Sequence, residues 1–315
     1  VTFIMEKNAL PTEQRNQDTI HIDEASTIEM LRMINHEDKK VATCVERHLD
    51  EIAAAIDAAS EKFAAGGRIV YCGAGTSGRM GFMDSAECPP TYGVPKERVV
   101  SLMAGGIAAV SQAKEDAEDH PELGVADLKG IAFTKGDVLV GLAASGRTPY
   151  VVGAMEYAKQ LGGITISVTC NENPDCPINR LADYPIGIYA GPEAITGSTR
   201  MKAGTVQKLV LNMFSTGVMV KTGKVYSNLM VNMHLSNQKL VRRAKDIVAD
   251  ITDANEEEID RLLEQTGRNV PLTIFMLLTG CPMDEAQACL AQKHGHIKNA
   301  LAAFYNSKQN QAAVT

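Results

Sequence analysis

The sequence predicts an α/β protein built on a doubly wound parallel sheet of about five strands. Five short apolar runs rich in β-branched residues alternate with helical stretches, and such runs are typical of parallel strands that are buried on both faces. The runs are 68–72, 99–103, 138–142, 164–169 and 185–189. Small residues and hydroxyls follow three of them. Because ligands of doubly wound sheets bind beyond the carboxyl ends of the strands, we expect the functional site there.

Three parts are predicted along the chain. Residues 1–60 form an N-terminal arm and helices, residues 61–227 the α/β domain, and residues 228–315 a small C-terminal helical bundle. In the first part, Ser26 and Glu29 form a capping-box pattern that starts a short helix. A longer helix is predicted from about Lys39 to Ala65, where two glycines end it.

Composition narrows the classes of partner. The net charge is −7 and the pI is about 5.6, which argues against binding to nucleic acid or to an anionic membrane surface. No secretory signal or membrane-spanning stretch is visible. The seven cysteines are scattered and contain no CxxC pair, so we expect reduced thiols in a cytoplasmic protein and no zinc site. A small anionic ligand remains compatible with this charge.

The first candidate loop follows the run 68–72 and reads Gly-Ala-Gly-Thr-Ser-Gly-Arg, residues 73–79. It matches the GxGxxG dinucleotide pattern, but the next strand ends in Ala-Gly-Gly and offers no acidic residue for a ribose hydroxyl. The hydroxyls of Thr76 and Ser77, with the free amides of a helix N-terminus around Gly78, instead suit a phosphate or sugar hydroxyls.

A second loop repeats this chemistry after the third strand, with Ser145, Gly146, Arg147 and Thr148 before a proline. A third segment, residues 191–202, again combines hydroxyls with cations ahead of a helix. Taken singly, such loops are most often ordinary helix caps. Three at one sheet edge favour a phosphorylated, hydroxyl-rich small-molecule ligand.

Two carboxylates are candidates for acid–base chemistry. The helix that carries Glu87 is expected to end near that residue because prolines follow it. The negative end of the helix dipole favours a protonated carboxyl, which suits a general acid, although a solvated helix-end residue is the simpler interpretation. Glu118 lies in a charged run with Lys114 four residues before it, so spacing alone predicts a solvated helical pair. His294 and His296 flank a glycine and predict a turn rather than a metal site.

Several motifs together resemble the N-acetylmuramic acid 6-phosphate etherases, which carry a sugar isomerase (SIS) domain. The resemblance rests on residues 73–80, 84–93, 144–150, 191–193 and 197–205, and extends to 10–16, 22–23, 228–231 and 237–240. One departure is Asn232, where an acidic residue is expected. The resemblance implies cleavage of the D-lactyl ether at C3 of N-acetylmuramate 6-phosphate, giving N-acetylglucosamine 6-phosphate and D-lactate during cell-wall sugar recycling.

The resemblance also implies residue roles. Glu87 matches the family's proton donor and Glu118 its second catalytic acid, which we interpret as the base that removes the C2 proton. Ser145, Gly146 and Thr148 match the phosphate-binding pattern, and Thr76 and Ser77 are expected to hold sugar hydroxyls or to share the phosphate. The other candidate substrate-binding residues are Gly78, Arg147, Glu193 and Ser198. No metal or organic cofactor is expected, because the open-chain aldehyde is the electron sink. A homodimer is expected by analogy.

Two alternative functions stay open at this point. SIS domains also serve as non-catalytic phosphosugar-binding regulators, and others are phosphosugar isomerases. A transcription regulator would add a basic helix-turn-helix module, which neither terminal segment resembles. Release of D-lactate distinguishes the etherase from both alternatives.

Overall fold

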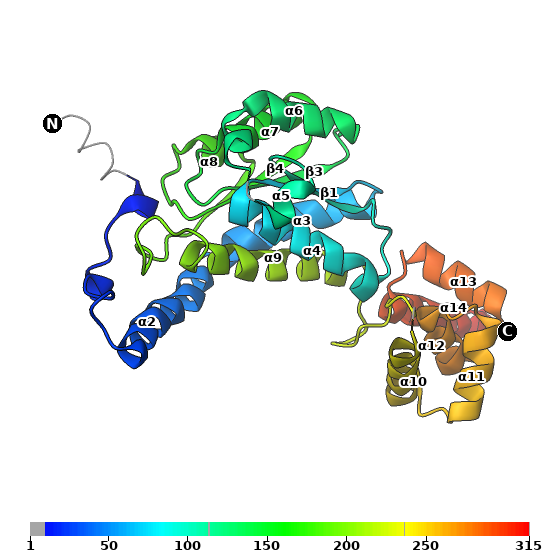
Figure 1. The fold of residues 1–315 in the computed structure, drawn as a ribbon. Helices are drawn as coiled ribbons and strands as arrows, with labels where there is room; N and C mark the ends of the chain where they lie inside the picture. The colour runs from blue at the N-terminus through cyan, green and yellow to red at the C-terminus, as the bar shows by residue number, and fades with distance from the viewer. Residues whose placement is uncertain (1–9, 113, 236, 315) are drawn as a thin grey trace. The chain divides into compact units, whose positions relative to one another are not determined.

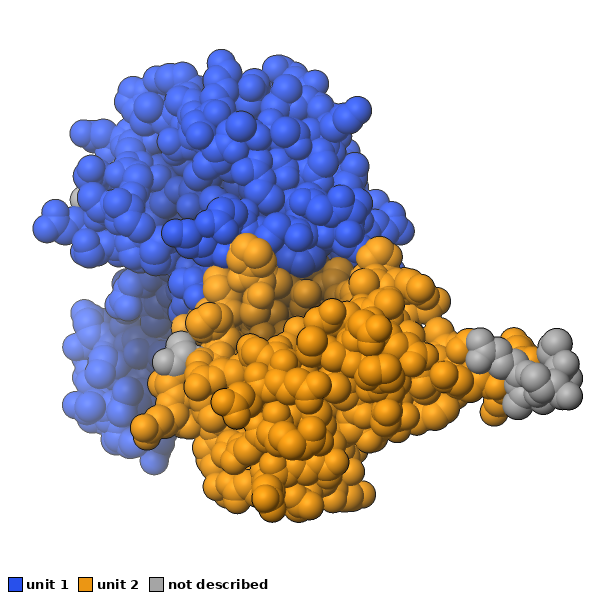
Figure 2. Space-filling view, turned by 90° about the vertical axis from the view of Figure 1, so that its right-hand side faces the viewer, with its two compact units in different colours: residues 1–86, 96–216 blue, residues 87–95, 217–315 orange. Residues whose placement is uncertain are grey.

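The computed structural model describes residues 10–112, 114–235 and 237–314. The chain forms two compact units, which Figure 2 colours separately. Unit 1 comprises Val1–Ala86 and Lys96–Thr216, and unit 2 comprises Glu87–Pro95 and Gly217–Thr315. Residues 1–9 of the predicted arm lie outside the described residues, and the division into three domains stays a prediction.

A five-stranded sheet forms the centre of unit 1. Its strands are β1 (Ile69–Gly73), β2 (Val99–Met103), β3 (Val138–Leu142), β4 (Ile164–Thr169) and β5 (Tyr184–Gly187). They pair in the order β2-β1-β3-β4-β5, and every neighbouring pair is parallel. The predicted fold class is therefore confirmed. Because the strand order reverses between β1 and β3, the loops after these two strands flank the switch point where doubly wound folds bind ligands.

Helices cover both faces of this sheet (Figure 1). One face carries α6 (Pro121–Gly130), α7 (Pro149–Gln160) and α8 (Pro177–Leu181). The other carries α3 (Leu49–Ala64), α4 (Gly75–Tyr92) and α9 (Lys202–Lys221). Side chains of α7 such as Tyr150, Val151 and Met155 are fully buried against Val70 and Leu139 of the strands. The central strands β1 and β3 are buried at every position, which explains why they are the most continuously apolar of the five.

The N-terminal helices differ from the prediction at their boundary. Helix α2 (Thr27–Glu46) begins at the Ser26 capping box, as expected, but it continues as one helix to Glu46. The break to α3 comes at Arg47 and His48, where we had expected it about ten residues earlier. Glu37 and Val41, on either side of the expected start of the second helix, are both buried. Contacts made with the rest of unit 1 therefore carry the helix through the polar stretch where we expected the first helix to end.

Helix α4 also runs further than expected. It passes through Glu87 and includes Pro89 and Pro90, so the predicted end near Glu87 is wrong. The helix stops at Gly93, which adopts a left-handed conformation (φ +63°) and donates its N–H to the Pro89 carbonyl at 2.9 Å. Pro89 and Pro90 lack the backbone N–H, so the helix loses only hydrogen bonds of its last turns. Gly93 is the residue that ends it.

Unit 2 is dominated by helices. They are α10 (Gln238–Thr252), α11 (Glu256–Gln265), α12 (Val270–Thr279), α13 (Met283–Gln292) and α14 (Ile297–Val314). Asn237, Asn255 and Asn269 each cap the helix that follows by accepting a backbone N–H, which is the role that asparagine prefers. Across the part of the chain that the structure describes, no helix has both the length and the apolar character needed to cross a membrane.

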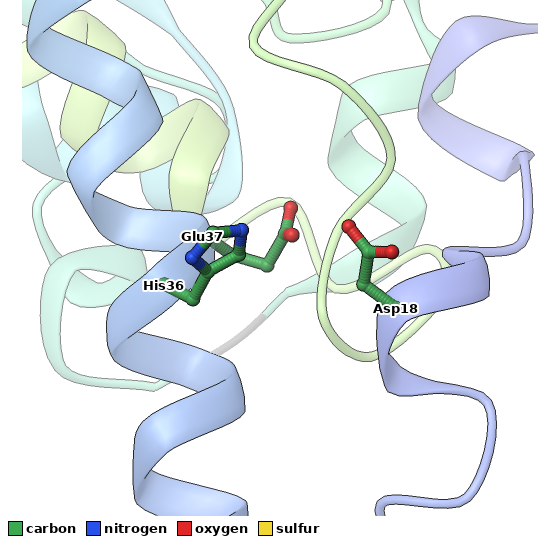
Figure 3. A group of neighbouring side chains, drawn as sticks. All are labelled: Asp18, His36 and Glu37. Atoms are coloured by element: carbon green, nitrogen blue, oxygen red, sulfur yellow. The ribbon is translucent and has the colours of Figure 1, made fainter.

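A buried ion pair connects α2 to the start of α9. The Nζ atom of Lys202 lies 2.5 Å from Glu37, and both side chains are 2% exposed. Lys40 contacts the other oxygen of Glu37 and also Asp18 at 3.1 Å. Asp18, His36 and Glu37 lie close enough together to resemble a cation site (Figure 3). Since the two lysines already neutralise these carboxylates, we interpret the cluster as a structural ion-pair network.

This network predicts a pH-dependent contribution to stability. Burial would raise the pKa of Glu37, but the hydrogen bonds from Lys202 and Lys40 outweigh burial and lower the pKa to about 2. A carboxyl group whose pKa is lowered by folding stabilises the fold at pH values above its ordinary pKa. This contribution is lost as the pH falls through the folded-state pKa. Glu37→Gln should reduce the free energy of unfolding by about 3 kcal/mol at pH 7, because it leaves Lys202 buried without its carboxylate.

Chemical denaturation of both proteins between pH 7 and pH 2.5 would measure this difference, which should shrink below about pH 4.5. Glu46→Gln, at an exposed position of the same helix, is the matched control and should change stability by less than about 0.5 kcal/mol. A constant difference between wild type and Glu37→Gln across this range would contradict the role of the ion pair.

Candidate active site

The first loop makes a tight turn from β1 into α4. A side chain on Gly78 would place its Cβ 2.8 Å from the Gly73 carbonyl oxygen and 2.9 Å from the side chain of Met103. Only glycine permits this approach. Thr76 is half-buried and Ser77 is buried in the first turn of the helix. The turn therefore brings both predicted hydroxyls to the carboxyl end of β1, beside amides that the helix itself leaves unpaired.

Gln207 of α9 holds the hydroxyl of Ser77. Its Nε2 atom donates to Ser77 Oγ at 2.9 Å, and Gln207 is 1% exposed. A hydroxyl has one proton and two lone pairs, so accepting from Gln207 leaves the Ser77 proton for another acceptor. Sequence reasoning missed Gln207. The sequence offered no distinctive signal, because Gln207 is one of several polar residues in this helix, with Lys208 beside it and Asn212 further along.

A cavity of about 230 Å³ opens beside the first loop. It is lined by Gly75, Thr76, Arg79, Met103, Ala104, Ala109, Lys114 and Glu118. Arg79 donates from Nε to the Val110 carbonyl and from Nη2 to the Ala109 carbonyl, both at 2.9 Å. These bonds fix the short helix α5 (Ala108–Ser111) next to the cavity. The structure thus brings Thr76 and Glu118 together, although 42 positions separate them in the sequence.

Glu118 is not part of the helical pair that its spacing suggested. It is exposed in the 3-10 helix η3 (Glu115–Asp119), and Lys114 lies outside that helix as its N-cap. The short 3-10 turn directs the chain back toward the end of β2. Because that placement depends on contacts with the turn after β2, local periodicity could not show it.

The second loop is supported from β4. Gly146 has φ +73°, and a Cβ there would lie 2.6 Å from Cys176 Sγ. Asn171, buried just after β4, donates from its side chain to the Ser145 carbonyl at 3.2 Å. The backbone N–H of Arg147 donates to Ser145 Oγ at 3.3 Å. With its carbonyl held by Asn171, the loop is arranged to offer amides and hydroxyls, which suits an anion.

The third segment is organised around Glu193. Its two carboxylate oxygens accept the backbone N–H groups of Lys202 and Ala203 at 2.8 and 2.9 Å. Burial raises the pKa of Glu193, and these bonds to the positive end of α9 oppose that effect. The contacts account for the buried carboxylate as a helix cap. Ser198 is half-buried in the turn before α9, and substrate binding by Glu193 or Ser198 stays a prediction.

Glu87 is an exposed residue of α4 and belongs to unit 2. The residues that structure the cavity and the two loops all belong to unit 1. The catalytic role of Glu87 therefore stays a prediction that rests on the sequence motif.

Three family models match different parts of the chain. The family model described as the glucokinase regulatory protein N-terminal SIS domain matches residues 51–159, and the SIS domain matches residues 127–217. A UBA-like domain matches residues 272–311, which span most of α12, all of α13 and most of α14. A solved phosphoheptose isomerase from Neisseria gonorrhoeae is 15% identical, with a TM-score of 0.47 over 61% of this chain and 98% of that chain.

Curated relatives match over nearly the full length. The N-acetylmuramic acid 6-phosphate etherase of Clostridium beijerinckii is 54% identical over 292 residues, which cover 93% of this chain and 95% of that protein. The protein of the same name from Aliivibrio fischeri is 52% identical over 293 residues, covering 93% of this chain and 97% of the relative. Identity at this level spans both units and all three loops. The chain therefore belongs to the N-acetylmuramic acid 6-phosphate etherase family.

Proposed function

We propose that this protein cleaves the D-lactyl ether of N-acetylmuramate 6-phosphate and releases N-acetylglucosamine 6-phosphate and D-lactate. The observation that carries the proposal is the pairing of β1 with β3, which aligns Gly73 with Leu142. The two Ser/Thr-Gly loops therefore leave the sheet side by side at its switch point. Hydroxyls and amides on both loops suit a ligand with a phosphate at one end and sugar hydroxyls along its length.

The reaction is an elimination followed by hydration. In the open-chain form, the aldehyde acidifies the C2 proton. A base removes that proton, the electron pair forms the C2–C3 double bond, and the C3–O bond breaks as a donor protonates the ether oxygen of the departing D-lactate. Water then adds at C3, and C2 regains a proton. Because the C–O bond is broken by elimination, we propose that the enzyme is a carbon–oxygen lyase.

We assign the proton transfers to two carboxylates. Glu118 is the C2 base, and its position on the cavity beside Thr76 supports this role. Glu87 is the proton donor to the ether oxygen, on the strength of its motif. Ser145, Gly146 and Thr148 bind the 6-phosphate, and Thr76 and Ser77 hold the sugar. The bond from Gln207 supports the assignment of Ser77, since it orients the hydroxyl as a donor.

We also propose a cytoplasmic location and a homodimer. All seven cysteines are free and six of them are buried, which is usual for proteins of reducing compartments. Ile28 and Leu31 lie one turn apart on α2 and are 54% and 53% exposed. Adjacent exposed aliphatic side chains on one helix face are typical of a protein–protein contact.

Light scattering should therefore give a molar mass of about twice the chain mass of 33.8 kDa. Replacing both Ile28 and Leu31 with aspartate should shift the mass toward that of one chain, because two charges would be buried at the contact. Arg261→Asp, at an exposed position of α11 in unit 2, controls for charge. A monomeric wild type would refute the dimer.

The proposed activity predicts stoichiometric release of D-lactate when the purified protein is incubated with N-acetylmuramate 6-phosphate. An enzyme-coupled lactate assay and detection of N-acetylglucosamine 6-phosphate would measure both products. Binding of the substrate without lactate release would point to a phosphosugar sensor. Migration of the carbonyl group with the lactyl ether intact would point to an isomerase.

The role of Glu118 predicts a specific isotopic result. In D2O, wild-type turnover should place deuterium at C2 of the product, whereas Glu118→Gln should lose both this exchange and about 10²- to 10⁴-fold in kcat. Asp116→Asn, an exposed neighbour in the same 3-10 helix, should retain both. If Glu118→Gln exchanged the C2 proton at the normal rate, another group would be the base.

A further inference from the structure

The cavity beside the first loop has basic side chains in its lining that the proposed mechanism does not use. Lys114 and Arg79 both line it, together with Glu118. We propose that Lys114 binds the carboxylate of the lactyl group and so selects a substrate that carries this group. The inference rests on the proposed function, because it concerns how the same site recognises its substrate.

Contacts with the turn after β2 place Lys114 at this cavity. Its Nζ atom donates to the Gly105 carbonyl at 3.3 Å. Gly105 has φ +82°, and a Cβ at that position would meet the Lys114 stem at 3.0 and 3.1 Å. The absence of a side chain at Gly105 thus lets the lysine stem lie across the turn. An ammonium group has three donors. Among the described residues the structure gives Lys114 Nζ the one bond to Gly105, which leaves two donors for a ligand.

The second cation is placed differently. Arg79 directs Nε and Nη2 to the carbonyls of Val110 and Ala109. These two bonds fix the guanidinium plane against backbone. Lys114, held by one bond and exposed, is the better suited of the two to meet an incoming anion.

The size of the cavity indicates which part of the substrate it takes. Pockets for whole small molecules usually measure about 300–1,000 Å³, and this one measures about 230 Å³. It therefore suits one end of a phosphosugar. The loop at Ser145 and Gly146 supplies amides and hydroxyls that suit the phosphate. The cavity is therefore left to bind the other anionic group of the substrate, the lactyl carboxylate.

Electrostatics give an independent reason for a cation here. The base must act next to the ether that carries the lactyl group, so Glu118 and the substrate carboxylate would share one small space. Two carboxylates at short range repel each other unless a cation compensates them. Lys114, which lines the same cavity, provides that compensation. The product N-acetylglucosamine 6-phosphate lacks the carboxylate and needs no such partner.

The test compares substrate with product. For Lys114→Met, KM for N-acetylmuramate 6-phosphate should rise about 10-fold or more, since a charge-assisted hydrogen bond is lost from both ground state and transition state. The inhibition constant of N-acetylglucosamine 6-phosphate should change less than about twofold. Lys114→Arg should recover part of the loss. Lys135→Met, which removes an exposed lysine just before β3 at the opposite end of the strands, should alter neither constant.

Equal losses for substrate and product would show that Lys114 serves the phosphate or the sugar, and unchanged constants would show that it binds neither; both outcomes overturn the proposal. Direct titration of the wild type and Lys114→Met with the two sugar phosphates measures the same selectivity without turnover. A wild type that released no D-lactate would refute the proposed function. The titration would still decide whether Lys114 distinguishes the lactyl group.

Discussion

The pairing of β1 with β3 is the constraint on which the rest of the site depends. Chain order takes the polypeptide from β1 outward to β2 and then back across to β3. The register that joins Gly73 to Leu142 makes both loops leave the sheet at the same level. A slip of one residue would turn the strand side chains to the opposite faces. In β3 it would put a side chain at the place of Gly141, where a Cβ would lie 2.5 Å from Met155 Sδ, so close packing forbids it. Core packing therefore sets the relative positions of the polar loops.

Helix α9 acts as a second frame for the same loops. At its start, Glu193 occupies the first free amides and Lys202 pairs with Glu37. One turn further, Gln207 reaches Ser77. Two turns beyond, Ser215 donates to the buried carboxylate of Asp84 at 3.0 Å. Each contact is polar and buried, so each would be costly to leave unpaired. The helix thereby ties α2, the third segment and α4 to one rigid element.

Much of the fold was readable because it is local or periodic. The five strands were predicted from apolar runs, and Ser26 with Glu29 marked a helix start that the structure contains. Errors arose where a tertiary contact, or a stronger local signal further along the chain, overrides the expected helix end. Burial of Val41 extends α2 past its expected end, and Gly93 stops α4 after two prolines that read as the terminator.

The candidate site was only partly predictable for the same reason. Glycines and hydroxyls at strand ends identify the loops, because parallel strands bring their carboxyl ends to one edge. The hydrogen bonds that support those loops join segments that are far apart in the sequence. Gln207 lies 130 positions from Ser77, and Asn171 lies 26 from Ser145. No pattern within a single segment encodes such pairs, so they emerge only once the fold is known.

The open character of the cavity fits the two stages of the proposed reaction. Elimination requires a base at C2, and Glu118, the proposed base, is exposed. Hydration then requires water at C3 after D-lactate departs. A closed, apolar pocket would favour the first stage and impede the second. The cavity lined by Thr76, Lys114 and Glu118 would, in the proposed mechanism, let water take the place of the lactyl group. In the proposed mechanism the loops of β1 and β3 hold the sugar meanwhile, so the anchoring groups and the exchanging groups are separated on the same sheet edge.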